Sequence, residues 1–95
     1  NFDGGGSVSI RDDFNISSIT DHDTGIYSVN YSSNFSNANY AIVGGVIGSS
    51  SSNHFSFVTS NSTSLSTSSS KFNICHHSGA RDDQGYVHII AFGDS

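Results

Sequence analysis

The sequence has no proline, methionine, tryptophan or glutamate, and it has only one leucine and one lysine. Leucine, glutamate and lysine are strong helix formers, so their scarcity argues against a helical protein. Serine, with 22 residues, is the commonest residue, and Ile, Val, Phe, Tyr and Thr supply most of the large apolar and β-branched side chains. These β-branched and aromatic residues favour strands. The composition therefore predicts an all-β protein.

A single cysteine and a shortage of positive charge exclude further classes of protein. Cys75 cannot form a disulfide within the chain, which excludes a disulfide-stapled scaffold, and we interpret Cys75 as a small buried core residue. Eight aspartates oppose three Lys and Arg residues, and the net charge of −5 repels nucleic-acid phosphates. No run approaches the ~18–20 apolar residues of a membrane span. We expect neither nucleic-acid binding nor membrane insertion.

The length of the chain limits it to one domain, over residues 1–95. Only 34% of the residues are hydrophobic, which leaves little apolar surface to offset the entropy lost on ordering the backbone. Hydrogen bonding or burial against partner chains must supply the rest, and we favour an oligomer. The sequence starts at Asn1 without an initiator methionine or a signal peptide, so we expect it to be the C-terminal end of a longer polypeptide.

Two apolar segments around a polar link form the centre of the predicted domain. Tyr27, Val29 and Tyr31 alternate with polar residues, which is the period of a strand with one buried face. Residues 40–46 are a nearly unbroken apolar run, which is typical of a strand covered on both faces. We interpret residues 32–39 as a tight turn that packs these strands close together, with Phe35 folding back onto the core.

Further alternating segments extend this pair into a larger fold. They lie at residues 7–11, 14–19, 54–59, 72–74 and 86–92, and polar or glycine-rich turns lie at 3–7, 20–25, 49–53 and 78–85. Residues 60–70 are rich in serine, and they form either a disordered segment or a loop followed by an edge strand pinned by Leu65. About seven short strands with frequent turns predict an antiparallel β-sandwich that resembles a jelly roll.

Two motifs that carry chemistry in other proteins have structural interpretations here. The Asp23-Thr24-Gly25 triplet matches the half-site of a dimeric aspartic protease, but a polar segment precedes it instead of an apolar strand, so we interpret it as a turn. Adjacent His76 and His77 point to opposite faces of a strand and do not converge on one metal ion. We expect no catalytic residue, no metal and no other cofactor.

The first half of the chain resembles the terminal domain of bacteriophage tail fibres and related virion appendages, especially in phages of marine bacteria. The matching motifs are Asn1-Phe2-Asp3-Gly4, Val8-Ser9-Ile10, residues 15–21, Thr24-Gly25, residues 27–30 and Asn39-Tyr40, and residues 86–93 are similar to the closing strand of that family. The resemblance covers most of residues 1–47 and 85–93. Residues 49–84 depart from it most.

The resemblance implies a β-sandwich that assembles as a trimer about a fibre axis and binds a receptor on the host envelope. The protein is then a virion component, attached to an upstream fibre shaft, without enzymatic activity. A trimer suits a weak polar contact, because linked sites raise avidity by ~10²–10⁴-fold. The alternative is a structural role, as a decoration of the virion or a trimerisation cap of a head or tail fibre.

If the receptor is an envelope polysaccharide, short polar side chains for hydrogen bonds and aromatic rings for stacking are needed at the loop tips. The side chains that we expect to bind it lie in or beside loops at 49–54, 60–64 and 76–86: Asn53, His54, Asn61, His76, His77, Arg81, Asp82 and Tyr86. A polysaccharide-cleaving enzyme needs two carboxylates ~5–10 Å apart in a groove, and the adjacent Asp82 and Asp83 are poorly placed for this.

Overall fold

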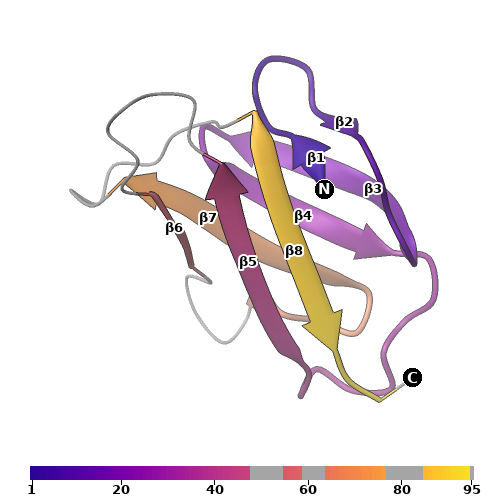
Figure 1. The fold of residues 1–95 in the computed structure, drawn as a ribbon. Coiled ribbons are helices and arrows are strands. Elements are labelled where there is room, and N and C mark those ends of the chain that lie inside the picture. Colours follow the sequence, from indigo (N-terminus) through magenta and orange to yellow (C-terminus); the bar gives the residue numbers. More distant parts are fainter. Residues whose placement is uncertain (48–54, 59–63, 77–84, 95) are drawn as a thin grey trace.

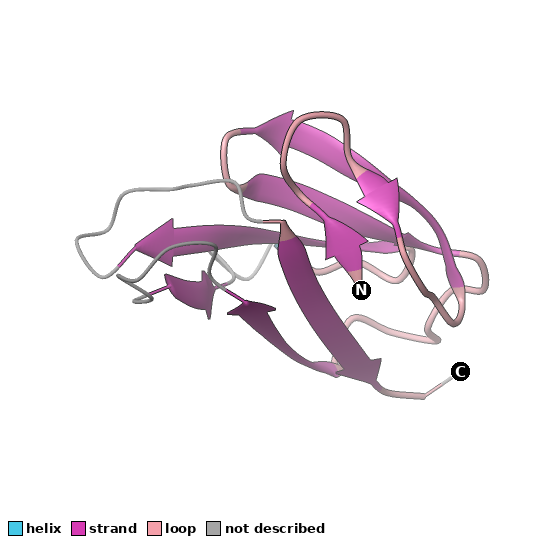
Figure 2. Ribbon diagram, turned by 45° about the horizontal axis from the view of Figure 1, so that its top comes forward, coloured by secondary structure: helices cyan, strands magenta, loops and turns pink. Residues whose placement is uncertain are grey.

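A computed structural model describes residues 1–47, 55–58, 64–76 and 85–94, which form eight strands in two four-stranded antiparallel sheets (Figure 1). The first sheet has the order β2 (Ser9–Ile10), β1 (Phe2–Asp3), β8 (Tyr86–Phe92) and β5 (Ala41–Ile47). The second sheet has the order β3 (Ile16–Asp23), β4 (Ile26–Tyr31), β7 (Ser69–His76) and β6 (Phe55–Val58). The predicted all-β antiparallel sandwich is confirmed, and Figure 2 shows strands and connecting loops without a helix in the described parts of the chain.

The core lies between the two sheets and consists mainly of aromatic side chains. Phe2, Tyr27 and Phe72 pack together with ring centroids 5.2 to 6.1 Å apart. Phe35 stacks on Tyr40 at 4.3 Å and meets the edge of Tyr31. Large rings let a chain with few hydrophobic residues fill the space between two sheets, because each ring buries much apolar area.

The link at residues 32–39 crosses between the sheets. Phe35 folds back onto the core, as the sequence predicts. The predicted tight turn between two closely packed strands is wrong, because β4 pairs with β3 and β7 while β5 pairs with β8. Two backbone hydrogen bonds hold the link in its crossing path, one from the Phe35 amide to the Thr67 carbonyl and one from the Ser36 amide to the Asp94 carbonyl.

One face of β5 is exposed, whereas the apolar run at 40–46 predicts a strand covered on both faces. Val43 is 63% exposed and Ile47 is 53% exposed. Ile42 and Val46 lie on the other face and are partly buried, and Val46 packs against the core. Within the described residues, only the second sheet packs on the first sheet, and it covers the inner face alone. A strand in such a two-layer fold needs apolar residues on one face only, whereas β5 has them on both.

The turn predicted at 20–25 shrinks to Thr24 and Gly25, because β3 continues through its polar residues to Asp23. An edge strand accepts polar side chains on its solvent face, so hydropathy alone misplaces its end. Gly25 has a φ of 68°, and the Thr24 amide donates to Asp23 Oδ1 at 2.7 Å. The interpretation of the Asp23-Thr24-Gly25 triplet as a turn is confirmed.

The same strand, β3, changes face along its length. The pairing with β4 shifts register between Ile16 and Ser18. This β-bulge brings both Ile16 and Ile19 against the core, although two residues three positions apart lie on opposite faces of a regular strand.

The serine-rich segment ends in an interior strand of the second sheet. Ser69 and Ser70 open β7, which lies between β4 and β6, so the predicted edge strand is wrong. Leu65 packs against the core and forms a bridge to Ser70, as the pinning role requires. The buried Ser70 hydroxyl, which bonds two tyrosines, explains how a serine can occupy this place.

Cys75 is only partly buried, which corrects its interpretation as a core residue. Phe72 and Ile74 on the same strand are fully buried. Because successive side chains of a strand point to opposite faces, Cys75 lies on the face away from them.

Candidate functional site

The outer face of the first sheet presents a row of exposed side chains. Directly opposed residues on neighbouring strands share a face, and the register of β5 and β8 pairs Ile47 with Tyr86, Gly45 with His88, Val43 with Ile90 and Ala41 with Phe92. We call these eight residues the β5–β8 outer face. Val87 between them points inward and is fully buried, which fixes the orientation of the strand.

This face is unusually apolar for a surface that nothing in the described residues covers. Phe92 is 74% exposed, Ile90 56% and Val43 63%. The hollow above Gly44 and Gly45 lies among Val43, His88 and Ile90. Contiguous exposed apolar residues on a soluble protein mark a surface that binds a partner.

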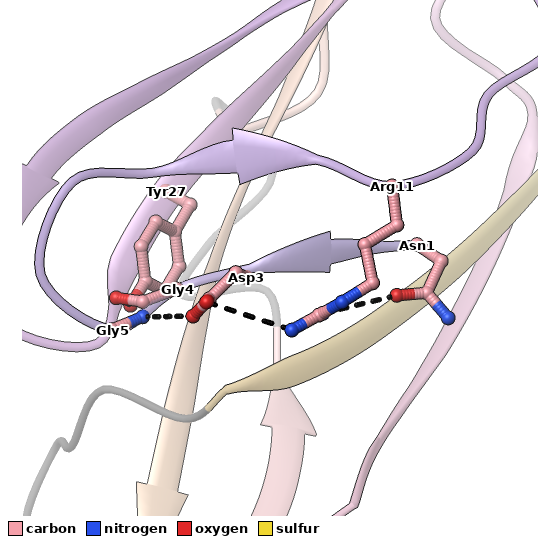
Figure 3. Close-up of polar contacts among 6 residues, drawn as sticks. All are labelled: Asn1, Asp3, Gly4, Gly5, Arg11 and Tyr27. Carbon is pink, nitrogen blue, oxygen red and sulfur yellow. Dashed lines mark hydrogen bonds and ion pairs between the residues drawn. The ribbon is translucent and has the colours of Figure 1, made fainter.

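The opposite end of the face, at Tyr86, is polar and charged. The Arg11 guanidinium carbon lies 4.0 Å from the centroid of the Tyr86 ring, a cation–π contact. Arg11 Nη2 lies 3.5 Å from Asp3 Oδ2, and Arg11 Nη1 donates to Asn1 Oδ1 at 3.4 Å (Figure 3). The pairing of β1 with β2 places these groups together, since Asp3 lies opposite Ser9 and Arg11 follows Ile10.

Further hydrogen bonds fix this polar end. Asp3 Oδ1 accepts from the Gly5 amide at 2.9 Å, which leaves Oδ2 for Arg11 (Figure 3). Asn1 Nδ2 lies 3.1 Å from His88 Nδ1, which continues the network onto the outer face. The arrangement combines a half-exposed phenol with a guanidinium, a carboxylate, an amide and an imidazole. Such a set can exchange hydrogen bonds with a polar ligand and stack on its apolar face.

Of the predicted site residues that the structure describes, Tyr86 alone belongs to this surface, at 46% exposure. His76 ends β7 in the other sheet, opposite Phe55 of β6. The other predicted residues lie outside the described parts of the chain: Asn53, His54, Asn61, His77, Arg81 and Asp82. The described residues therefore do not bring any two of the predicted residues together.

Sequence reasoning missed Arg11, Asp3, His88 and the apolar residues beside them. The alternation in residues 86–92 puts Tyr86 and His88 on one face, and this signal could have found His88. No local signal could have found Arg11, because its place beside Tyr86 depends on the pairing of β1 with both β2 and β8.

Residues 1–47, 55–58, 64–76 and 85–94 contain no candidate metal site. No three His, Cys, Asp or Glu side chains gather there in a way that could hold a metal ion. His22 Nε2 instead lies 2.8 Å from Ser28 Oγ. Nor do the described residues include a helix long and apolar enough to span a membrane.

No protein family, no curated protein and no solved structure matches the chain in sequence or structure comparisons. The resemblance to phage tail-fibre domains stays a prediction.

Proposed function

We propose that the chain is a non-enzymatic tip domain of a bacteriophage virion appendage, such as a tail fibre, and that it binds a host-surface receptor, an envelope polysaccharide. The observation that supports this best is the Tyr86 end of the outer face, where the tyrosine ring lies beside a guanidinium, a carboxylate, an amide and an imidazole. Tyr86, His88 and Asp3 of this group lie on strands of the first sheet. Sites on sheets hold their geometry better than sites on loops.

A sugar ligand suits the chemistry of this end of the face. Sugar hydroxyls both donate and accept hydrogen bonds, and this end of the face offers both kinds of partner: the Arg11 guanidinium donates, the Asp3 carboxylate accepts, and a neutral His88 imidazole has one nitrogen of each kind. Arg11 covers one face of the Tyr86 ring, and the 46% of Tyr86 that stays exposed is available to a sugar. The contact of one copy is small, and a trimer on a fibre shaft would compensate through avidity of ~10²–10⁴-fold.

The second candidate is a structural role, and the apolar end of the same face favours it. Burying Val43, Ile90 and Phe92 against partner chains would stabilise a trimer, because each apolar side chain contributes ~1.5–3 kcal/mol when fully buried. In that case the domain is a trimerisation cap or a virion decoration and has no ligand.

Binding to an array of bacterial surface glycans separates the two roles. We expect the native protein to bind a subset of glycans and Tyr86→Ala to lose at least about tenfold in affinity, which corresponds to ~1.4 kcal/mol. Ser32→Ala, at an exposed position in the link between the two sheets, serves as the control and should bind normally. A protein that binds no glycan, and whose deletion from the virion prevents fibre assembly, would contradict receptor binding and establish the structural role.

A further inference from the structure

A large apolar cleft opens between the two sheets, on the side of the sandwich where the chain begins. Its volume is about 730 Å³. Ile19, Val29 and Tyr31 of the second sheet form its floor. One wall is residues 12–16, and the other is residues 89–93, with Asn1 at one end.

The register of the first sheet shows that the cleft lies where a further strand could pair with the free edge of β8. β1 pairs with β8 at one position only, Phe2 with Val87. Beyond that pair β8 continues through Ile89 to Phe92, and among the described residues no strand pairs with it on this side. The line of β1, extended past Asn1, runs along the cleft between residues 12–13 and residues 89–92.

The walls of the cleft favour a peptide over a small apolar molecule, because one of them is the unpaired edge of a strand. Alternate residues of a strand direct their backbone N–H and C=O groups to one edge, and these groups pair best with another strand. The residues opposite Ile89 and Ala91 would point inward, as Phe2 does opposite Val87, so they must be apolar to fill the cleft. Asp12 and Asp13 on the facing wall make an acidic strand unfavourable.

We propose that the cleft is a strand-acceptor site. Its occupant is an extended, apolar, neutral or basic polypeptide segment that runs antiparallel to β8 and ends at Asn1. The strand continues the existing β1 pairing and covers the floor formed by Ile19, Val29 and Tyr31. The cleft shares Asn1 with the polar end of the outer face, but Tyr86 and Arg11 do not line it, so variants of Tyr86 and of Ala91 test receptor binding and strand binding separately.

The test uses a synthetic capped peptide of alternating valine and threonine with a flanking lysine, titrated into the ¹⁵N-labelled protein. We expect the peptide to slow amide hydrogen exchange at alternate residues of 89–92 by at least about tenfold and to shift resonances of Ile19 and Val29. A peptide of the same composition with a central proline should do neither, because proline removes a ladder hydrogen bond.

Two variants separate the site from a general effect of the peptide. Ala91→Phe places a ring in the cleft and should abolish the protection, whereas Val43→Ser, on the outer face, should leave it unchanged. Failure to protect 89–92, or equal loss in both variants, overturns the proposal. So does protection of these amides without peptide in a dimer of the native chain, since the occupant is then a second copy.

A covalent version keeps the test decisive if the free peptide binds too weakly or Ala91→Phe does not fold. Joining the same valine–threonine segment to the amino end of Asn1 should raise Tm by about 5 °C or more relative to the proline version, since 1 kcal/mol shifts the Tm of a domain of this size by ~4–8 °C. Equal Tm values for the two fusions, with no added protection at 89–92, would overturn the strand-acceptor site and leave the receptor-binding proposal untouched.

Discussion

At the scale of single residues, the core depends on one serine. Ser70 is fully buried, and its hydroxyl lies 2.6 Å from the Tyr31 hydroxyl and 2.7 Å from the Tyr40 hydroxyl. Tyr40 also donates to the carbonyls of Ser66 and Ser69. The network joins the two sheets through polar atoms, because Tyr31 and Ser70 belong to one sheet and Tyr40 leads into the other.

Replacing Ser70 by alanine should cost about 1–3 kcal/mol of unfolding free energy, because it removes the partner of the buried Tyr31 hydroxyl. Urea denaturation monitored by tyrosine fluorescence measures the change. Ser9→Ala, at an exposed position, is the control and should change stability by no more than about 0.5 kcal/mol. Equal stabilities of the two variants would contradict the role given to Ser70.

Burial raises the pKa of the Tyr31 phenol to about 12, with a smaller opposing effect from its hydrogen bond to Ser70. The folded chain then keeps a proton that the unfolded chain releases near pH ~10. Stability from this group is complete below pH ~10 and falls as the pH rises from there towards 12. Alkaline titration followed by tyrosinate absorbance should show a late-ionising phenol that Tyr31→Phe removes. A Tyr31→Phe variant with an unchanged titration curve would argue against this assignment.

Gly93 and Gly45 differ in the space available for a side chain, so alanine substitutions at the two positions form a matched pair of variants. A Cβ at Gly93 would collide with the Cβ of Tyr40 and crowd Phe35, whereas a Cβ at Gly45 meets nothing within 4 Å. Gly93→Ala should destabilise the fold by about 1–3 kcal/mol through overpacking. Gly45→Ala should stabilise it by up to about 1 kcal/mol, because it reduces the entropy of the unfolded chain. Thermal unfolding of both variants checks the signs, and a stabilising Gly93→Ala would contradict the packing at Tyr40.

At the scale of elements, the seven-residue ladder of β5 and β8 is more apolar than a two-layer sandwich requires. The inner residues Val46, Val87, Ile89 and Ala91 belong to or pack against the core. The outer residues Val43, Ile90 and Phe92 are also apolar, but they are exposed to solvent. A strand pair with two apolar faces needs two layers of cover, and the described residues supply only one.

Replacing Phe92 by serine should therefore dissociate the proposed trimer while leaving the fold intact. Phe14→Ser is the matched control, because Phe14 is 94% exposed but lies off the outer face. Light scattering should give the trimer mass for the native chain and for Phe14→Ser, and a lower mass for Phe92→Ser. A native chain that is a monomer would contradict the trimer and leave the sandwich unaffected.

The alternation of apolar and polar residues predicted the strands whose own sequence shows which face is buried. It found the strand of Tyr27, Val29 and Tyr31, the closing strand at 86–92 and the bulged strand around Ile16 and Ile19. It failed where a distant partner decides burial. The polar end of β3 is a strand because β4 pairs with it, and Ser70 is buried because its hydroxyl forms hydrogen bonds with the hydroxyls of two tyrosines.

Much less of the candidate site could be predicted. Tyr86 was found from its place beside a loop. Its neighbours Arg11 and Asp3 come from the other end of the chain, through pairings that a single sequence does not specify. The exposure of Val43 and Phe92 was missed for the same reason. Hydropathy predicts that an apolar side chain is buried, but it does not say whether the same chain or a partner chain buries it.

At the scale of the whole molecule, β8 lies between β1 and β5, although it comes last in the chain (Figure 1). The β3–β4 hairpin closes across Thr24 and Gly25 and can form early, because short loops cost little entropy. β1 and β5 share no pairing and must wait for the final strand. The first sheet thus assembles late, through contacts of long sequence separation, which slow folding. Until β8 joins the sheet, β5 has no pairing partner among the described strands and β1 is paired with β2 alone.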